Sequence, residues 1–211
     1  MPRRLPIFPL GTVLLPFGLL PLHVFEQRYR ALMADLLGEP PGSDPGDAEM
    51  GIVLIERGHE VGGGEERSPL GTVARLVQAE RFPDGRWFIL AAGSHRFRVV
   101  SWLLDDPYPL AEVEHLPAES WREGCGAGLR TAEQEVRRAI ALAGELGEPA
   151  AQPELSEDPV AASWQLCNAV PVGAFDRQRL LAAPDLGERI ALLEDLAREA
   201  AAVLTFRLSH G

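Results

Sequence analysis

The sequence contains no lysine, since all 20 of the basic residues among its 211 are arginines. A phosphate-binding P-loop places a lysine on the β- and γ-phosphates, a Schiff-base enzyme uses a lysine amine, and a Ser-Lys hydrolase uses lysine as its base. The absence of lysine therefore excludes these three reaction classes from this stretch of protein.

Cysteine is also scarce, and Cys125 and Cys167 form no C-x-x-C pair. This spacing indicates neither a disulfide framework nor a zinc knuckle, and free thiols fit a reducing, cytoplasmic location. The histidines show no H-E-x-x-H motif and no ligand spacing; they are His23, His59, His95, His115 and His210. We expect no bound metal and no cofactor.

A surplus of positive charge is absent too, because 31 acidic residues against 20 basic ones give a net charge of −11. A protein of this charge lacks the electrostatic footprint for nucleic acid or for an anionic membrane. RNA binding stays an alternative only through a local arginine patch, drawn from Arg75, Arg81, Arg86, Arg96 and Arg98.

No long hydrophobic run is free of proline. Residues 5–25 carry no charged side chain and follow two arginines, as in a signal peptide or a membrane-spanning helix. Prolines interrupt this stretch at positions 6, 9, 16 and 21, and each removes a helical hydrogen-bond donor. We predict strands near 5–8 and 19–24 and no membrane span.

An amphipathic helix is expected next, ending at Gly38. The apolar residues at helical spacing are Phe25, Tyr29, Leu32, Met33 and Leu36. Residues 38–49 consist of turn formers and acids and are expected to form a loop, and the glycines at 62–64 are expected at a hairpin tip.

Further strands are indicated by β-branched and aromatic runs at 50–56, 71–82, 86–93, 95–104 and 110–116. Pro83-Asp84-Gly85 predicts a tight hairpin turn, because glycine supplies a positive φ. We expect residues 1–118 to form a mostly antiparallel sheet curled on itself, with one helix packed against it.

After residue 118 the hydrophobic period changes from 2 to 3.6. A capping box at Thr131–Gln134 predicts one helix start, and Asp158 before Pro159 predicts another. Further helices are expected at 175–182 and 186–208. The fold class is therefore α+β, with residues 119–211 forming a helical bundle.

Catalytic chemistry is not indicated. Ser94-His95 and Ser43-Asp44 supply the residue types of a Ser-His-Asp triad, but the chain has no G-x-S-x-G nucleophile elbow. A triad is defined by geometry and not by residue type, so we expect no catalytic residues.

The opening "LPIFPLGTVLLPFGLLPLHVFEQRYRALM" resembles that of the Lon protease N-terminal, substrate-binding domain family. Its motif positions are occupied by Leu5, Pro6, Phe8, Pro9, Leu10, Val13, Pro16, Pro21, Leu22, Phe25, Glu26, Arg28 and Tyr29. Later strands resemble the family at Gly51, Gly71, Gly85, Gly93, Arg96 and Phe97, and residues 173–204 resemble its helical end.

This resemblance implies a PUA-like β-barrel over residues 1–118 followed by the helical bundle. In full Lon proteases the domain helps to capture substrates, and an ATPase and a Ser-Lys protease domain follow it. Without lysine neither active site exists in these residues, so we expect a stand-alone, non-catalytic recognition module.

As anchors for the apolar segments of unfolded or damaged proteins we select Phe17, Leu19 and Leu20 in the proline-framed segment. The alternative is that all three are buried. The family-motif residues are expected to be structural, and Glu26 and Arg28 are expected to form a pair that ties the first helix to the barrel.

A second function class is a small-molecule-binding protein or enzyme that uses a pocket in the barrel. A pocket near Glu26, Arg96 and Arg98 would favour that class. The sequence does not indicate an oligomeric state.

Overall fold

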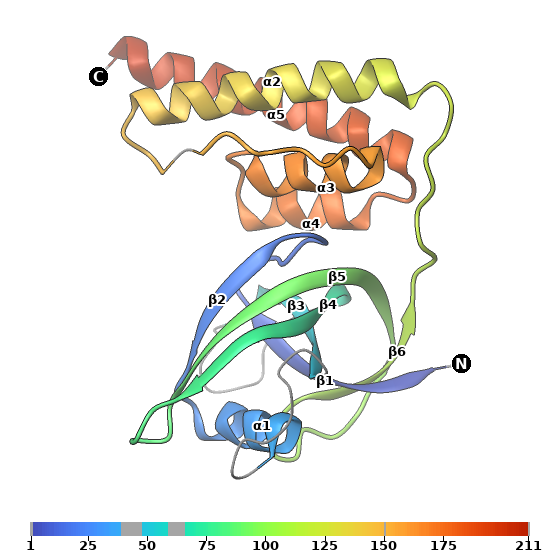
Figure 1. Cartoon of the computed structure of the whole chain (residues 1–211), viewed down its shortest axis with the longest axis vertical. Helices are drawn as coiled ribbons and strands as arrows, with labels where there is room; N and C mark the ends of the chain where they lie inside the picture. Colours follow the sequence, from blue (N-terminus) through green and yellow to red (C-terminus); the bar gives the residue numbers. More distant parts are fainter. Residues whose placement is uncertain (1, 39–47, 59–65, 150, 211) are drawn as a thin grey trace. The chain divides into compact units, whose positions relative to one another are not determined.

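The computed structural model describes residues 2–38, 48–58, 66–149 and 151–210. The chain divides into two compact units, Met1–Pro117 and Ala118–Gly211 (Figure 1). The division into a β-barrel domain of residues 1–118 and a helical-bundle domain of residues 119–211 stays a prediction. The predicted glycine tip at 62–64 and most of the predicted loop at 38–49 lie outside the described residues.

The first unit is a six-stranded sheet with one helix. Its elements are β1 (Arg3–Leu10), β2 (Leu19–Val24), α1 (Gln27–Leu37), β3 (Glu49–Arg57), β4 (Glu66–Arg81), β5 (Trp87–Trp102) and β6 (Leu110–His115). The strand order is β2-β5-β4-β3-β1-β6, and β6 pairs with β5 as well as with β1. All pairs are antiparallel except β1 with β3.

The residues predicted as two strands at 86–93 and 95–104 form the single strand β5. β2 pairs with β5 along residues 87–92, whereas β6 pairs with it along residues 97–102. In addition to β4, β5 thus pairs with β2 along its first half and with β6 along its second half, and this lets the sheet curl on itself. The mixed α/β content is as predicted; that the sheet is a PUA-like barrel stays a prediction.

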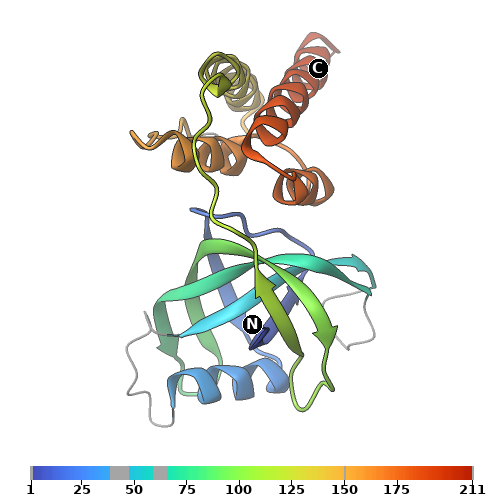
Figure 2. The same ribbon diagram turned by 90° about the vertical axis from the view of Figure 1, so that its right-hand side faces the viewer.

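Helix α1 lies across one end of the curled sheet (Figure 2). It buries Tyr29, Leu32, Met33 and Leu37 in an apolar cluster with strand residues from β1 to β5. Gly38 ends the helix with a φ of 79° and donates its N–H to the carbonyl of Ala34, as predicted.

Phe25 differs from the expectation that it shares the buried face of this helix. The helix begins only at Gln27, so Phe25 lies between β2 and the helix and is 57% exposed. Spacing predicts which side chains share a buried face only for residues that are part of the helix, and Phe25 is not one of them.

The Pro83-Asp84-Gly85 turn is confirmed. Gly85 has a φ of 81°, and the N–H of Phe82 donates to the carbonyl of Arg86 at 2.8 Å. The turn joins β4 to β5 and fixes their long antiparallel register.

The second unit consists of helices α2 (Cys125–Glu145), α3 (Pro159–Ala169), α4 (Ala174–Ala182) and α5 (Leu186–His210). Asp158 caps α3 as predicted, since its Oδ1 accepts the N–H of Val160 at 3.1 Å. That these helices form the helical bundle implied by the family resemblance stays a prediction.

The predicted helix start at Thr131 is wrong, because α2 already begins at Cys125. Thr131 lies inside the helix, and its hydroxyl donates to the carbonyl of Ala127 at 3.1 Å. A threonine that bonds back to the preceding turn has the same sequence signature as an N-cap.

None of the helices within the described ranges combines the length and hydropathy that a bilayer crossing requires.

Candidate functional site

The two faces of β2 differ in exposure. Leu19, Pro21 and His23 are exposed, whereas Leu20, Leu22 and Val24 are partly or fully buried against the core. This alternation follows from the two-residue period of a strand. The exposed side chains of Phe17 (54%) and Leu19 (64%) are thus available at the surface, while Leu20 packs inward.

Phe17 has an unusual backbone conformation, with a φ of 60°. A bulky residue with a positive φ is strained, and such strain persists only where surrounding contacts hold it. Here the N–H of Phe17 donates to the carbonyl of Gly93 at 2.8 Å, and the N–H of Gly93 donates to the carbonyl of Gly18 at 2.9 Å. These bonds hold the segment before β2 against β5, with the phenyl ring exposed.

Gly93 is required for this close approach. A Cβ atom at this position would lie 2.2 Å from the carbonyl oxygen of Leu15. Pro16 follows immediately and is buried, so the family-motif residues Pro16 and Gly93 shape the segment that displays Phe17.

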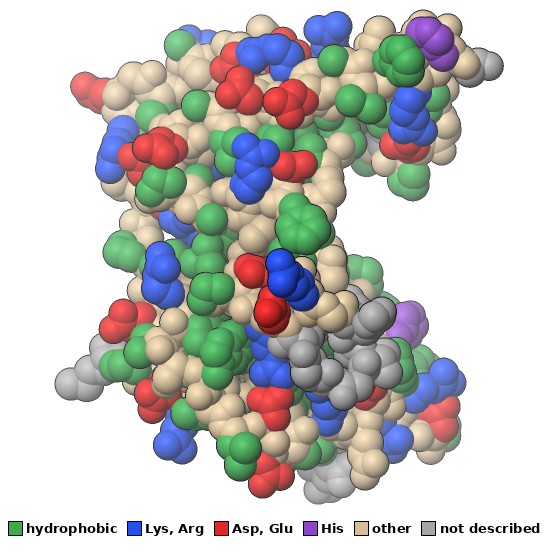
Figure 3. All heavy atoms as spheres, turned by 180° about the vertical axis from the view of Figure 1, so that it is seen from behind, with side chains coloured by type: hydrophobic (Ala, Val, Ile, Leu, Met, Phe, Trp, Pro, Cys, Tyr) green, Lys and Arg blue, Asp and Glu red, His purple; other side chains and the backbone are tan. Residues whose placement is uncertain are grey.

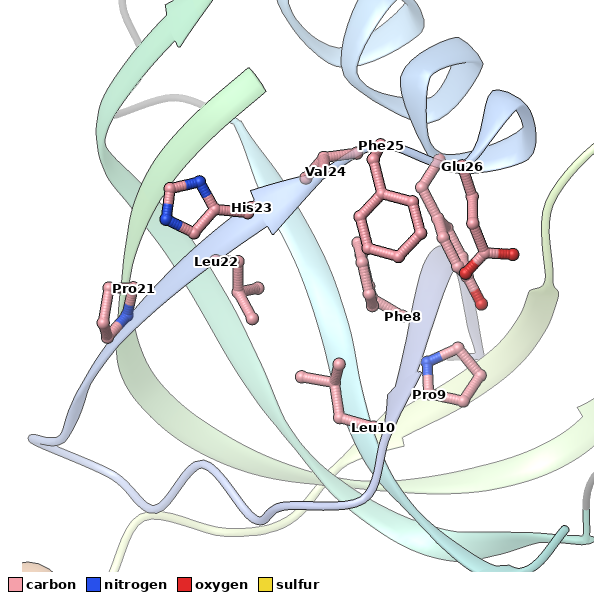
Figure 4. Close-up of a pocket in the computed structure, with 10 residues that line it drawn as sticks. Phe8, Pro9, Leu10, Pro21, Leu22, His23, Val24, Phe25 and Glu26 are labelled. Atoms are coloured by element: carbon pink, nitrogen blue, oxygen red, sulfur yellow. The ribbon is translucent and has the colours of Figure 1, made fainter. Parts of the chain in front are cut away.

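A pocket of about 220 Å³ lies between β1 and β2. Its lining residues are Phe8, Pro9 and Leu10 from β1, Pro21 to Val24 from β2, and Phe25, Glu26 and Tyr29 at the start of α1. In Figure 4 the side chains of Phe8, Leu10 and Leu22 lie between the ribbons of the two strands. The exposed ring of Phe25 borders the same pocket. Because the sequence pattern placed Phe25 on the apolar face of the helix, it was not predicted to be a binding residue.

Glu26 and Arg28 form the expected ion pair, with 3.2 Å between Oε2 and Nε. That this pair ties the first helix to the barrel stays a prediction. The Arg28 guanidinium lies 4.5 Å from the centre of the Tyr29 ring, and that ring stacks on Phe8 of β1 at 4.0 Å. Tyr29 therefore connects the helix to β1, and Arg28 packs against the ring that makes this contact.

The family-motif residues at the other end of the sheet contribute to packing. Phe97 is fully buried, and a Cβ atom at Gly71 would lie 2.7 Å from its ring and 2.3 Å from the carbonyl oxygen of Ile52. A Cβ atom at Gly51 would also lie 2.7 Å from the Phe97 ring. Both glycines make room for Phe97. That the family-motif residues Gly71 and Phe97 are structural stays a prediction.

Arg96 and Arg98 do not share the pocket with Glu26. Neither arginine lines it; Arg96 is 9% exposed in β5, and Arg98 lies on the surface of that strand. The pocket between β1 and β2 therefore joins Glu26 to neither arginine, and a small-molecule site near all three residues stays a prediction.

The arginines of the proposed RNA patch lie among acidic side chains. Arg75 is 3.8 Å from Glu49, and Arg86 is 2.7 Å from Asp84. On the face shown in Figure 3, basic side chains are likewise interspersed with acidic ones. Carboxylates at these distances reduce the positive potential that a nucleic acid would require.

Ser94 and His95 form a hydrogen-bond chain without a triad. The Ser94 hydroxyl donates to the carbonyl of Val73 at 3.0 Å and lies 2.9 Å from Nδ1 of His95, whose Nε2 lies 2.8 Å from Nδ1 of His115. A serine hydroxyl has one proton, so while it donates to Val73 it cannot also donate to His95.

Burial and the neighbouring His115 lower the pKa of His95, so this ring is neutral near pH 7. The third group of the chain is a histidine and not an aspartate, and Ser43 and Asp44 lie outside the described residues. The chain therefore connects β5 to β6.

A second hollow, of about 320 Å³, lies in the helical unit beside α4 and α5. Its apolar lining includes Val172, Leu196 and Val203, and the Arg207 guanidinium at its rim donates to Glu148 at 2.6 Å. Within the described ranges, three or more potential metal ligands do not gather at any point.

Comparison with known proteins points to one family. Residues 4–199 match the family described as the ATP-dependent protease La (LON) substrate-binding domain. Over 203 residues the chain is 31% identical to Lon protease 2 of Sorangium cellulosum, and over 207 residues it is 30% identical to Lon protease 2 of Myxococcus xanthus. These alignments cover 89% and 93% of this chain but 24% of each relative.

Solved structures agree with this match. The Lon N-terminal domain protein from Xanthomonas campestris superposes with a TM-score of 0.61 at 26% identity, covering 90% of this chain and 96% of that one. The N-terminal domain of the Mycobacterium avium complex Lon protease also gives 0.61, at 15% identity and with 92% and 98% coverage, which concerns the fold alone.

Proposed function

The chain belongs to the family of Lon protease substrate-binding domains, and on that premise we propose that it binds exposed apolar segments of unfolded or damaged polypeptides. The homology supports a substrate-recognition module. We further propose that the module is non-catalytic and acts in protein quality control, with unfolded chains as its partners.

The observation that carries this proposal is the apolar surface of β2 and its flanks. Phe17, Leu19 and Phe25 are each more than half exposed, and Pro21 lies on the same outward face of the strand as Leu19. Exposed apolar side chains along a strand that also lines a pocket are typical of a protein-binding surface. The strained backbone of Phe17 supports this reading, because strain at a displayed residue is often retained for function.

Pocket size favours a polypeptide over the alternative of a small-molecule ligand. Pockets that enclose drug-sized ligands or cofactors usually have volumes of about 300–1,000 Å³. The pocket between β1 and β2, at about 220 Å³, is better matched to one apolar side chain of a longer chain that continues across the surface.

We predict that the double variant Phe17→Asp/Leu19→Asp binds unfolded polypeptide at least about tenfold more weakly. Burying an aliphatic or aromatic side chain contributes roughly 1.5–3 kcal/mol, and each 1.4 kcal/mol changes the dissociation constant about tenfold. The measurement is fluorescence anisotropy of a labelled, permanently unfolded polypeptide titrated with each protein.

The matched control is Phe175→Asp, which changes an equally exposed phenylalanine (66%) in α4 that borders neither hollow. It should bind like the parent, and all variants should keep the parent's circular dichroism spectrum. Equal affinities for the double variant and the parent would contradict the proposed location of the site. Absence of binding by the parent would contradict the proposed function.

A further inference from the structure

β2 is an edge strand, and its outer edge borders the pocket. It pairs with β5 through Leu19–Val24, and no other strand pairs with it among the described residues. A proline in a paired strand lies where its missing N–H would face away from the partner. Pro21 therefore indicates that the backbone groups of Leu19, Pro21 and His23 face outward, because the pattern repeats every second residue.

The far side of the pocket is also an open strand edge. β1 pairs with β6 only through Arg3–Pro6 and with β3 through Ile7–Leu10. The edge of Phe8, Pro9 and Leu10 that faces away from β3 has no strand partner among the described residues. The pocket thus occupies an interruption between two strand edges, with a proline on each edge.

The outer edge of β2 offers more hydrogen-bond acceptors than donors. The outward groups of β2 comprise the carbonyls of Leu19, Pro21 and His23 but only the N–H groups of Leu19 and His23, because proline has none. Prolines on an exposed edge also hinder pairing between two copies of the same protein. An occupant that brings N–H donors fits this edge better than a second β2 strand does.

The charge of the site favours a basic occupant over an acidic one. Residues 1–117 contain 16 acidic and 11 basic residues, and Glu26 is the charged side chain that lines the pocket. Oε2 of Glu26 accepts from Arg28, and Oε1 has no hydrogen-bond partner among the residues that the structure describes. A cationic side chain next to the bound apolar residue would pair with this oxygen.

We propose that the bound polypeptide segment is extended and pairs with the outer edge of β2 as an added strand, with one apolar side chain in the pocket and a basic residue beside Glu26. This inference rests on the proposed function and specifies the conformation and charge of its ligand. Hydrogen bonds to the peptide backbone do not depend on side chains, so strand addition lets one site accept many sequences.

The test uses a labelled peptide of alternating leucine and threonine that ends in arginine. Two further peptides carry N-methyl groups on alternate backbone nitrogens, one on the odd and one on the even positions. In an added strand only every second N–H faces β2. We therefore expect one methylated peptide to bind at least about tenfold more weakly and the other to bind like the parent, since each lost hydrogen bond contributes about 1 kcal/mol.

Charge is tested by replacing the arginine of the peptide with glutamate. The arginine peptide should bind several-fold more tightly, and Glu26→Gln should remove this difference. The control Glu80→Gln, at an exposed position of β4, should leave the difference unchanged. Equal binding of the two peptides to the parent protein would overturn the charge assignment.

If both methylated peptides bind like the parent peptide, strand addition is wrong, while the apolar site of Phe17 and Leu19 is unaffected. If neither the peptides nor unfolded polypeptide binds, the proposed function itself fails. A reversible dimer in sedimentation experiments that Leu19→Asp dissociates would identify a second copy as the occupant and would also overturn this proposal.

Discussion

Glu119→Ala should lower the free energy of unfolding of the helical unit by about 3–5 kcal/mol, the cost of leaving a buried charge without its partner. The charge is that of Arg189, which is fully buried. Nη1 of Arg189 donates to Oε1 of Glu119 at 2.5 Å, and Nη2 donates to the hydroxyl of Ser163 at 2.9 Å. Without Glu119, the guanidinium has no carboxylate partner and no access to water.

Trp164 makes this network more sensitive to the loss of Glu119. Its indole N–H donates to Oε2 of Glu119 at 3.1 Å, and its ring lies 3.6 Å from the Arg189 guanidinium. The Nε atom of Arg189 already lacks a hydrogen-bond partner among the described residues, so little alternative bonding is available. One substitution therefore disturbs two buried donors at once.

The measurement is urea denaturation of the full chain, followed by the helical circular dichroism signal. The control is Glu194→Ala, which removes a carboxylate that pairs with the half-exposed Arg198 on the surface of α5. Surface pairs of this kind contribute at most about 1 kcal/mol. A loss for Glu119→Ala no larger than that of Glu194→Ala would show that the buried pair does not stabilise the unit.

Gly93→Ala should destabilise the β-sheet unit by about 2–4 kcal/mol and should also weaken the binding of unfolded polypeptide. The new methyl group would meet the carbonyl oxygen of Leu15 at 2.2 Å, which is a backbone atom and cannot rotate away. Overpacking costs typically 1–3 kcal/mol, and the two hydrogen bonds between Gly93 and the segment of Phe17 and Gly18 contribute about 1 kcal/mol each.

Binding is expected to weaken because the methyl group displaces the segment that displays Phe17. Thermal denaturation and the anisotropy titration, at a temperature where the variant is folded, measure the two effects. Gly173→Ala is the control, since a Cβ atom there meets nothing within 4 Å. If Gly93→Ala matches Gly173→Ala in both assays, the close approach at Gly93 contributes neither to stability nor to the site.

The family relationship and most strand and helix positions were already evident in the sequence. Residue preferences predicted correctly those features that depend on a few adjacent residues. Pro83-Asp84-Gly85 forms its turn, Asp158 caps α3, and Gly38 ends α1. A turn or a cap depends on the φ preference and hydrogen-bonding groups of a few adjacent residues, and these are read directly from the residue types.

The same residue preferences failed where the structure depends on residues that are near in space but distant in the sequence. Thr131 resembles an N-cap but lies inside α2, and the residues predicted as two strands form the single strand β5 because two different strands pair with its two halves. The alternation that turns Leu20 inward and Leu19 outward is a property of β2 on its own, but which face is covered depends on the core beneath it.

The absence of lysine-dependent chemistry, the family and the approximate order of elements followed from the amino-acid sequence, because composition and local periodicity are properties of the chain alone. The exposure of Phe17 and Phe25, the burial of Arg189 with Glu119, and the pocket between the unpaired edges of β1 and β2 became evident only in the folded structure. Exposure, ion pairing and strand edges arise from contacts between residues far apart in the sequence, so no local pattern specifies them.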